Sequence, residues 1–274
     1  MLSEKLTEIS GLAASEQYPN TLWAHNDSGH STSLFAFDLE GTSLTRVELN
    51  SQSVDIEDMA LSQGIVYLAD IGDNNSKRQN IEILRFSEPS PSDPPGTTIS
   101  DYEAITLTYP DGPHDAEAFL VDTDGTMVLL TKESDSKNLA RANPSQIFVA
   151  EPPIRWGDSQ ELRHAGTLDL VPAYSSNPDA SQSLLAFGEL KRLVTGADMR
   201  ADGQVVAVRN YSNVWLFERE SSMSIADALQ GVPCDAPIPT EPQGESVAFL
   251  NPDSNAIVTV SEGVNPPVNV SRTD

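Results

Sequence analysis

Short apolar runs alternate with turns along the whole chain, and one run with a polar first position recurs five times. After each copy come a turn rich in Asp, Asn, Pro or Gly and a second apolar run of strand type, a pattern typical of β-strands. The copies occupy residues 10–14, 57–61, 117–121, 195–199 and 245–249. Each copy therefore predicts the first strand of one repeating β unit.

The spacing of the copies predicts the architecture. Successive copies begin 47, 60, 78 and 50 residues apart, which suits four-stranded propeller blades joined by loops of unequal length. The predicted strands are 9–14, 21–25, 33–38 and 43–49; 56–61, 64–70, 81–86 and 102–109; 116–121, 126–131, 146–150 and 161–170; 194–199, 204–209, 213–218 and 233–239; and 245–250, 256–260 and 267–271. We also expect an exposed loop at 87–98, a polar interruption at 171–183 and a short helix at 222–230.

The last unit is one strand short, and the N-terminal segment at residues 5–8 is its natural partner. Pairing this segment as the fourth strand would close the ring and remove the unpaired edges that favour aggregation. The sequence thus predicts an all-β fold, a five-bladed β-propeller of four-stranded antiparallel blades that forms a single domain over residues 1–274. A six-bladed ring is the alternative, and it would need a further blade within residues 122–193.

Acidic residues outnumber basic ones, with 41 Asp and Glu against 16 Lys and Arg and a formal charge of −25. This charge opposes nucleic acid and anionic membrane surfaces as partners and favours cations or neutral and cationic molecules. A solvated acidic surface suited to a salty or extracellular setting is the alternative interpretation. The single cysteine, Cys234, excludes an internal disulfide and a cysteine-rich metal cluster.

The location of the protein stays open. No apolar run approaches the roughly 20 residues of a membrane-spanning helix, so we expect no membrane insertion. The N-terminal residues 1–8 are too polar for the core of a signal peptide. The protein is either cytoplasmic or made with a signal peptide outside this sequence, and a periplasmic or secreted location is favoured in the second case. We expect a monomer that binds a small molecule or a protein at the channel mouth.

The first position of the repeat carries the candidate chemistry. In a propeller the innermost strand of each blade runs along the central channel, so equivalent side chains from all blades meet near the axis. These residues are Ser10, Glu57, Glu117, Thr195 and Glu245. Three carboxylates at short range need a counter-charge, and an all-oxygen ligand set favours Ca²⁺ ahead of Mg²⁺. The alternative is a water-filled channel in which the two hydroxyls only bond to strand ends.

This ring resembles that of the calcium-activated nucleotidases, which are five-bladed apyrases. The similarity lies in the blade number and in the Ser, Glu, Glu, Thr, Glu order of the ring. It implies a central Ca²⁺ held by these residues and hydrolysis of a phosphoanhydride. The segments 9–13, 70–74 and 194–198 are also similar to those of uncharacterised bacterial propeller proteins, for which the resemblance implies no particular activity.

The second strands of the blades should end on one face of the disc, above the ring. We expect His25 or Asp70 to serve as general base on a metal-bound water and Lys132 and Arg209 to hold an anionic group. The other candidate ligand-binding residues are Asn26, Asp27, Asp73, Asn74, Tyr211 and Glu262. Because His25 to Gly29 and Asp70 to Asn75 are also good turn sequences, a purely structural role is the alternative for both segments.

Motifs of other enzyme classes are absent from the sequence. It contains no G-x-S-x-G elbow, no H-E-x-x-H, no C-x-x-C and no phosphate-binding Gly-rich loop. The leading hypothesis is a calcium-dependent hydrolase of a phosphate ester, anhydride or lactone. The competing hypothesis is a non-enzymatic propeller that binds a ligand or protein and uses its axial metal only for structure.

Overall fold

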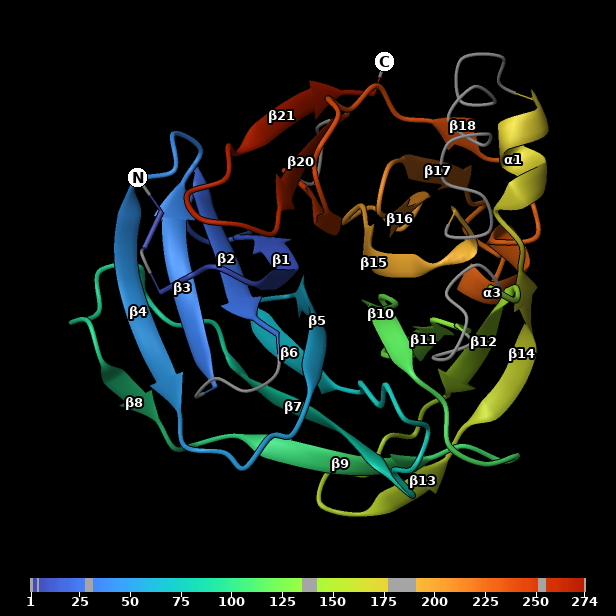
Figure 1. Cartoon of the computed structure of the whole chain (residues 1–274). Helices are drawn as coiled ribbons and strands as arrows, with labels where there is room; N and C mark the ends of the chain where they lie inside the picture. Colours follow the sequence, from blue (N-terminus) through green and yellow to red (C-terminus); the bar gives the residue numbers. More distant parts are fainter. Residues whose placement is uncertain are drawn as a thin grey trace.

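The computed structural model describes residues 2–3, 5–27, 32–134, 142–176, 191–250 and 255–273. Their strands form five sheets arranged as blades around one axis (Figure 1), which confirms the all-β, five-bladed prediction. The innermost strands are β1 (Ile9–Ala14), β5 (Ile56–Ser62), β10 (Ala116–Val121), β15 (Val194–Met199) and β19 (Gly244–Phe249). Each of them packs beside the next, and β19 returns to β1. The ring therefore closes with five blades.

The blades follow the order of the sequence. The first two blades continue with β2 (Thr21–Asn26), β3 (Ser33–Asp38) and β4 (Ser43–Leu49), and with β6 (Ile65–Asp70), β7 (Ile81–Ser87) and β9 (Glu103–Thr108). The others continue with β11 (Met127–Thr131), β12 (Ser145–Ala150) and β14 (Arg163–Leu168); β16 (Val205–Asn210), β17 (Val214–Glu218) and β18 (Cys234–Asp235); and β20 (Ala256–Ser261) and β21 (Asn269–Arg272). The three inner strands of every blade match the predicted bounds to within two residues.

Two blades gain a fifth strand that the sequence did not predict. The strand β8 (Thr97–Ile99) begins inside the predicted loop 87–98 and pairs in parallel with β4 of the preceding blade. In the same way β13 (Ser159–Glu161) leaves the third blade and pairs in parallel with β9 of the second. These connections cover outer edges that would otherwise expose unpaired N–H and C=O groups.

The N-terminal segment corrects one detail of the prediction. In the described chain, residues 5–8 form no strand and the fifth sheet has three strands. Instead, Leu2 and Leu6 are buried in an apolar cluster shared by the first and fifth blades. The Asn26 side chain accepts hydrogen bonds from the backbone N–H groups of residues 7 and 8 (both 3.1 Å) and donates one to the carbonyl of Lys5 (2.7 Å). The segment thus docks on the first and fifth blades by apolar burial rather than by strand pairing.

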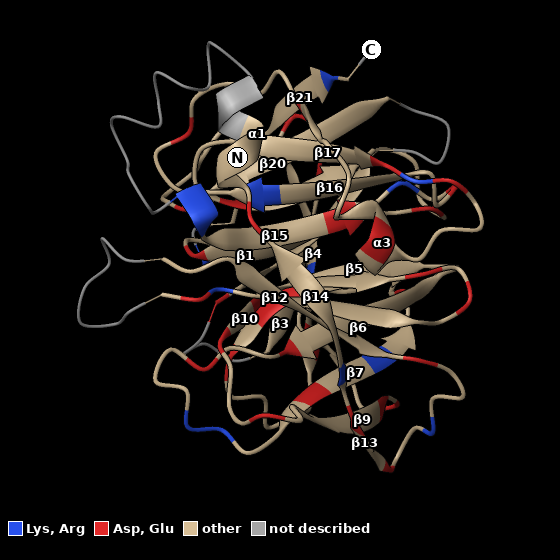
Figure 2. Cartoon of the chain, turned by 90° about the vertical axis from the view of Figure 1, so that its right-hand side faces the viewer, with Lys and Arg blue, Asp and Glu red and all other residues tan. Residues whose placement is uncertain are grey.

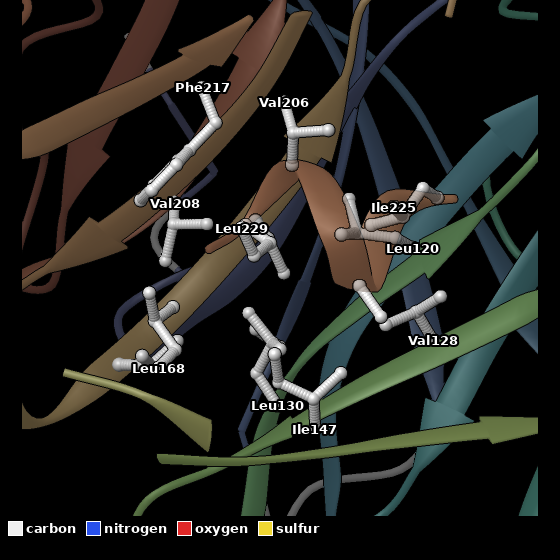
Figure 3. Close-up of a cluster of buried hydrophobic side chains, with 14 of the residues drawn as sticks. Leu120, Val128, Leu130, Ile147, Leu168, Val206, Val208, Phe217, Ile225 and Leu229 are labelled. Atoms are coloured by element: carbon white, nitrogen blue, oxygen red, sulfur yellow. The ribbon is translucent and has the colours of Figure 1, made fainter. Parts of the chain in front are cut away.

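A large part of the core lies between the third and fourth blades. There the helix α3 (Ile225–Ala228) and its C-terminal Leu229 pack with Leu120, Val128 and Leu130 (Figure 3). The helix confirms the one predicted at 222–230, and the Ser224 hydroxyl caps its N-terminus by accepting from the Asp227 N–H.

The polar interruption at 171–183 begins with the helix α1 (Val171–Ser176), while residues 177–183 lie outside the described residues. No helix in the described ranges is long and apolar enough to cross a membrane. Acidic residues are distributed over strand ends and loops, with few basic ones among them (Figure 2).

Candidate functional site at the channel mouth

The repeat position coincides with a β-bulge in the inner strands. In β5, Ile56 pairs with Asp70 and Asp58 pairs with Ala69, so Glu57 has no partner of its own on β6. The same shift occurs in the other four inner strands, at Glu117, at Thr195, at Glu245 and across Ser10 and Gly11. A bulge interrupts the alternation of a strand and re-aims the extra side chain. The five oxygen-bearing residues are therefore equivalent in structure as well as in sequence, and all five are buried.

The two hydroxyls of the ring connect neighbouring blades. Ser10 Oγ donates to the backbone carbonyl of Glu57 and lies 3.4 Å from its carboxylate Oε2. Thr195 Oγ1 donates to the carbonyl of Gly244, at 2.8 Å. Both hydroxyls thus make the strand-end contacts that the alternative interpretation of the ring expects.

A lysine pairs with one of the three ring carboxylates. Lys132 follows β11 directly, and its Nζ lies 2.7 Å from Glu117 Oε1 and 5.4 Å from the centre of the Tyr211 ring. Burial opposes the charge of Lys132, but attraction by Glu117, Tyr211 and Glu245 raises its pKa well above the ordinary value. Lys132 therefore stays an ammonium, and it provides a counter-charge in contact with Glu117 that also lowers the pKa values of Glu57 and Glu245 against the effect of burial.

The ring carboxylates hold their protons more tightly than exposed ones. Burial raises the pKa of Glu117 to about 8, against the opposing effect of Lys132, and raises that of Glu245 to about 7. Burial, followed by repulsion from Glu117, Asp27 and Asp55, raises the pKa of Glu57 well above its ordinary value. These groups favour a neighbouring cation, because a positive charge offsets both causes.

A second acidic group lies beside the ring. Carboxylate oxygens of Asp27, Asp55 and Glu57 lie within 4.8 Å of one another. Asp27 directly follows β2, and Asp55 directly precedes β5. A Cβ at position 72 would lie 2.2 Å from Glu57 Oε1 and 2.6 Å from Asp55 Oδ2, so glycine at this position leaves room for both carboxylates. We call Asp27, Asp55 and Glu57 the mouth triad.

The loop after β6 supports this triad. Asp70 accepts hydrogen bonds from the N–H groups of Val54 and Asp55 (both 2.9 Å) and pairs with Arg78 at 2.8 Å. Asp73 accepts from the backbone N–H groups of residues 77 and 78 and donates its own N–H to the Asp115 carboxylate at 2.8 Å. Asn74 is exposed. The contacts of Asp70 and Asp73 match the turn interpretation of this loop, and those of Asp70 also position Asp55.

His25 and Arg209 lie away from the mouth, which corrects their expected position. The His25 ring is buried, with Nδ1 3.0 Å from its neighbour's carbonyl and Nε2 directed at Gly11, and burial lowers the pKa of this histidine. The Arg209 guanidinium is fully buried, bonds to the Ser246 carbonyl at 2.7 Å and pairs with Glu241. Both side chains are buried between blades, and their predicted roles toward a ligand stay predictions.

The mouth contains residues that the five-residue repeat did not predict. Gln243 Nε2 bridges Glu245 Oε1 at 3.0 Å and Glu262 Oε2 at 2.6 Å. Gln243 and Asp55 each stand two positions before a ring glutamate, and Asp115 has the same place before Glu117. A polar residue two positions before each ring glutamate is therefore the sequence feature that could have identified Gln243, Asp55 and Asp115.

The position directly after the second strand is also shared between blades. In four blades it is occupied by Asp27, Lys132, Tyr211 and Glu262. Asn26 precedes Asp27, but its side chain is hydrogen-bonded to the N-terminal segment. These four predicted ligand-binding residues therefore lie at the mouth, because each directly follows the second strand of its blade.

Comparisons with known proteins add no assignment of function. No protein-family model matches the sequence, and no curated protein is significantly similar to it in sequence. Among solved structures, the chain is similar to hydrazine synthase of Kuenenia stuttgartiensis, with 10% identity and a TM-score of 0.46 over 97% of this chain and 71% of that one. It is also similar to a luciferin-regenerating enzyme, with 12% identity and a TM-score of 0.47 over 97% of this chain and 91% of that one. The resemblance of the ring to the calcium-activated nucleotidases stays a prediction from sequence.

Proposed function

We propose that this propeller binds a divalent cation, Ca²⁺ in the first place, through Asp27, Asp55 and Glu57 at the mouth of the channel. The observation that carries the proposal is the separation of at most 4.8 Å between the triad oxygens. Two oxygens bound to the same Ca²⁺ lie at most about 5 Å apart, because each Ca–O bond measures about 2.3–2.6 Å. The triad therefore needs little rearrangement to hold the ion.

The donor set and its surroundings support a hard cation. All three donors are carboxylate oxygens, which suit Ca²⁺ and do not favour Zn²⁺. The space left by Gly72 lets Glu57 and Asp55 approach each other beside the backbone. The net charge of −25 adds an attractive field for cations over the whole molecule. The ring and the triad share Glu57, so this assignment keeps one of the five ligands predicted from the repeat and moves the ion toward the first and second blades.

A binding function fits the mouth better than the predicted hydrolase. The two candidate bases, His25 and Asp70, are buried, and Asp70 and the candidate anion ligand Arg209 are held by ion pairs within the fold. A bound divalent ion would supply Lewis acidity, but a hydrolase also needs a free base beside the substrate. The proposed ligand is accordingly the ion itself, and with it a neutral or cationic small molecule or protein surface that the acidic mouth admits.

Hydrolysis is the second candidate, and one observation favours it. Burial raises the pKa values of Glu117 and Glu245 to about 8 and about 7, so both carboxyl groups can take up and release protons near neutral pH. An uncharged substrate such as a lactone fits this acidic mouth better than a phosphate ester or anhydride does.

Calorimetry and thermal unfolding with Ca²⁺ test the proposal. The wild-type chain should bind one ion, and at a hundredfold excess over Kd the midpoint should rise by about 5–10 °C. Asp55→Asn combined with Glu57→Gln should abolish both responses. Glu262→Gln removes one charge from the same mouth and should leave the response within twofold.

A second double variant distinguishes an ion in the mouth triad from an ion in the axial ring. Glu117→Gln with Glu245→Gln should retain Ca²⁺ binding if the ion lies in the triad, and loss of binding would return the ion to the axial ring. Wild-type protein that binds no Ca²⁺ would contradict the proposal. Calcium-dependent turnover of a lactone that Glu245→Gln removes would establish the hydrolase candidate.

A further inference from the structure

Two adjoining hollows lie at the ends of the inner strands opposite to the ring, with volumes of about 30 and 80 Å³. Their linings together include the last residues of all five inner strands. They share five lining residues, Glu16, Leu61, Asp198, Met199 and Ala201, and we call the two together the far hollow. Because roughly 10–15 Å³ of such space holds one water molecule, the far hollow has room for a ligand of a few non-hydrogen atoms.

The five-residue repeat is apolar at this end of the strands, with one exception. Its fourth residue is Asp198 in the fourth blade, whereas the other four copies have Ala13, Ala60, Leu120 and Ala248. Its fifth residue is apolar in every copy, Met199 and Phe249 among them. Most residues that line the far hollow are likewise apolar. Asp198 therefore places one carboxylate against a largely apolar wall.

Backbone groups hold this carboxylate in place. Its Oδ2 accepts a hydrogen bond from the Phe249 N–H at 2.7 Å, across the interface with the fifth blade. A carboxylate has about four acceptor sites, and the N–H groups of Met199 and Phe249 leave others for a ligand. Asp198 is only half-buried, so a ligand can reach it. Burial and repulsion from Glu16 raise the pKa of Asp198 to about 7, and a cation beside it would offset both causes.

The far hollow contains no basic side chain among the described residues that line it. Arg219 lies next to Met199, with Nη1 3.8 Å from Sδ, but it pairs with Asp122 at 2.5 Å. Arg200 pairs with Asp202 at 2.8 Å. Asp198 has no ion pair within the described chain, so a ligand can supply its counter-charge.

We propose that the far hollow binds a small alkylammonium ion, with the ammonium on the Asp198 carboxylate and the carbon chain against the apolar wall around Leu61 and Met199. An organic cation fits better than a metal ion, because Ca²⁺ takes 6 to 8 oxygen ligands and a carbon chain gains from apolar contact. Glu16 at the exposed rim adds to the attraction for a cation. The inference goes beyond the proposed function and stands without it, since the mouth triad lies at the other end of the inner strands.

Ligand-observed NMR titrations of the full-length protein test this with n-propylammonium chloride at constant ionic strength. A pH of 8 keeps Asp198 ionised, and millimolar concentrations suit a ligand with so few atoms. The neutral isostere n-propanol should bind about tenfold more weakly or worse, because it lacks the charged hydrogen bond. Nα-acetyl-lysine methylamide carries the same ammonium on a larger body and should also bind more weakly. Tighter binding of this capped lysine would overturn the assignment to a free amine.

A matched pair of variants tests the carboxylate. Asp198→Asn keeps an acceptor for the Phe249 N–H but removes the charge, and it should weaken n-propylammonium binding by about tenfold or more. Asp124→Asn is the control and should keep the Kd within twofold. Asp124 is exposed on the turn between β10 and β11, accepts from the Thr126 N–H at 2.8 Å and lines neither hollow. Equal losses in the two variants would assign the binding to the general field of the acidic chain and overturn the inference.

A change of shape gives a second test that does not depend on Asp198→Asn being folded. Ala201 is exposed and lines both hollows, so Ala201→Leu narrows them without changing the charge. It should weaken n-propylammonium binding by about fivefold or more. An unchanged Kd in this variant, or equal affinities of the wild type for n-propylammonium and n-propanol, would overturn the inference.

The two proposals fail separately. Asp55→Asn combined with Glu57→Gln should bind n-propylammonium like the wild type, and Asp198→Asn should keep the wild-type response to Ca²⁺. A wild-type chain that binds Ca²⁺ but not the amine would overturn the role of the far hollow and leave the proposed function standing. Binding of the amine without Ca²⁺ would support the far hollow and contradict the proposed function.

Discussion

Charged residues have different roles at two levels of the second strands, namely at the mouth and deeper between the blades. The mouth is lined by residues one position past the strand pairing, Lys132 among them, whereas Arg209 stands two positions before its mouth equivalent Tyr211. At about 3.3 Å per residue, this difference places Arg209 about 7 Å deeper. Lys132 keeps 15% of its side chain exposed, and Arg209 keeps none.

The depth of burial determines the role of each charged side chain. Arg209 is removed from water completely, and its partner Glu241 is itself satisfied by the Thr259 hydroxyl and the Asn269 amide, both at 2.6 Å. A charge without water needs partners within the protein, and those of Arg209, Glu241 and the Ser246 carbonyl, are part of the fold. Lys132 pairs with Glu117 and keeps part of its own side chain exposed at the mouth. On the second strands, the charge beyond the last paired position is therefore the more accessible of the two.

Removing the deep cation should have the largest effect of the three changes considered. Arg209→Met leaves Glu241 buried without its counter-charge and should lower the free energy of unfolding by about 3–5 kcal/mol. Arg163→Met is the control, because its pair with Glu151 is exposed and should contribute nothing measurable. Urea unfolding of both variants checks this.

The double variant tests the cause of the loss. Arg209→Met with Glu241→Gln should recover part of the stability, because no unpaired charge remains in the interface. Equal losses in Arg209→Met and Arg163→Met would mean that depth does not distinguish the two regions.

A smaller effect should follow at His25, which occupies the Arg209 level in the first blade. A Cβ at Gly11 would lie 2.2 Å from His25 Nε2 and 2.8 Å from the Met59 backbone nitrogen. Gly11→Ala should therefore cost about 1–3 kcal/mol through overpacking. The same substitution in a His25→Ala background should cost less, because the ring has been removed. Equal costs in the two backgrounds, measured by urea unfolding, would show that the ring is not what fills this interface.

The sequence predicted the fold well because its signals are local. Each blade begins with a five-residue run whose first side chain carries an oxygen, and the hydrophobic runs predict the bounds of the three inner strands to within two residues. The strand predicted in the N-terminal segment was wrong, because a short run around Leu6 has the same pattern whether it pairs at an edge or docks between blades. The parallel strands β8 and β13 were not predicted either, since each has only three residues and a partner in another blade.

The site was predictable in part for the same reason. The bulge residues were identified because they repeat, and Glu57 belongs to both the predicted ring and the mouth triad. The roles of Lys132 and Arg209 could not be separated from sequence, because both follow an apolar run and differ by two residues in register. The pairing of Asp27 with Asp55 joins two blades and has no local signal. Depth and inter-blade contact are properties of the closed ring, and one unit of the repeat contains neither.

The smallest effect should be a difference in pH dependence between His25 and His114. Burial lowers the pKa of His25, so below about pH 6.5 the unfolded chain binds more protons than the folded one, and the contribution of His25 to stability falls as pH falls. His114 bonds to Glu133 at 2.8 Å, and this contact raises its pKa against the effect of burial. Its contribution is complete below about pH 6.5 and is lost as pH rises through the raised value.

Stability differences between the wild type and His25→Gln, and between the wild type and His114→Gln, should therefore change in opposite directions between pH 5.5 and 8. Each slope is bounded by about 1.4 kcal/mol per pH unit, the limit for one proton. Urea unfolding across this range measures both slopes, and subtracting each variant removes the titration of the carboxylates that the chains share. Slopes of the same sign would mean that the His25 ring is hydrated, and the interface between the first two blades would then be as open to water as the mouth is.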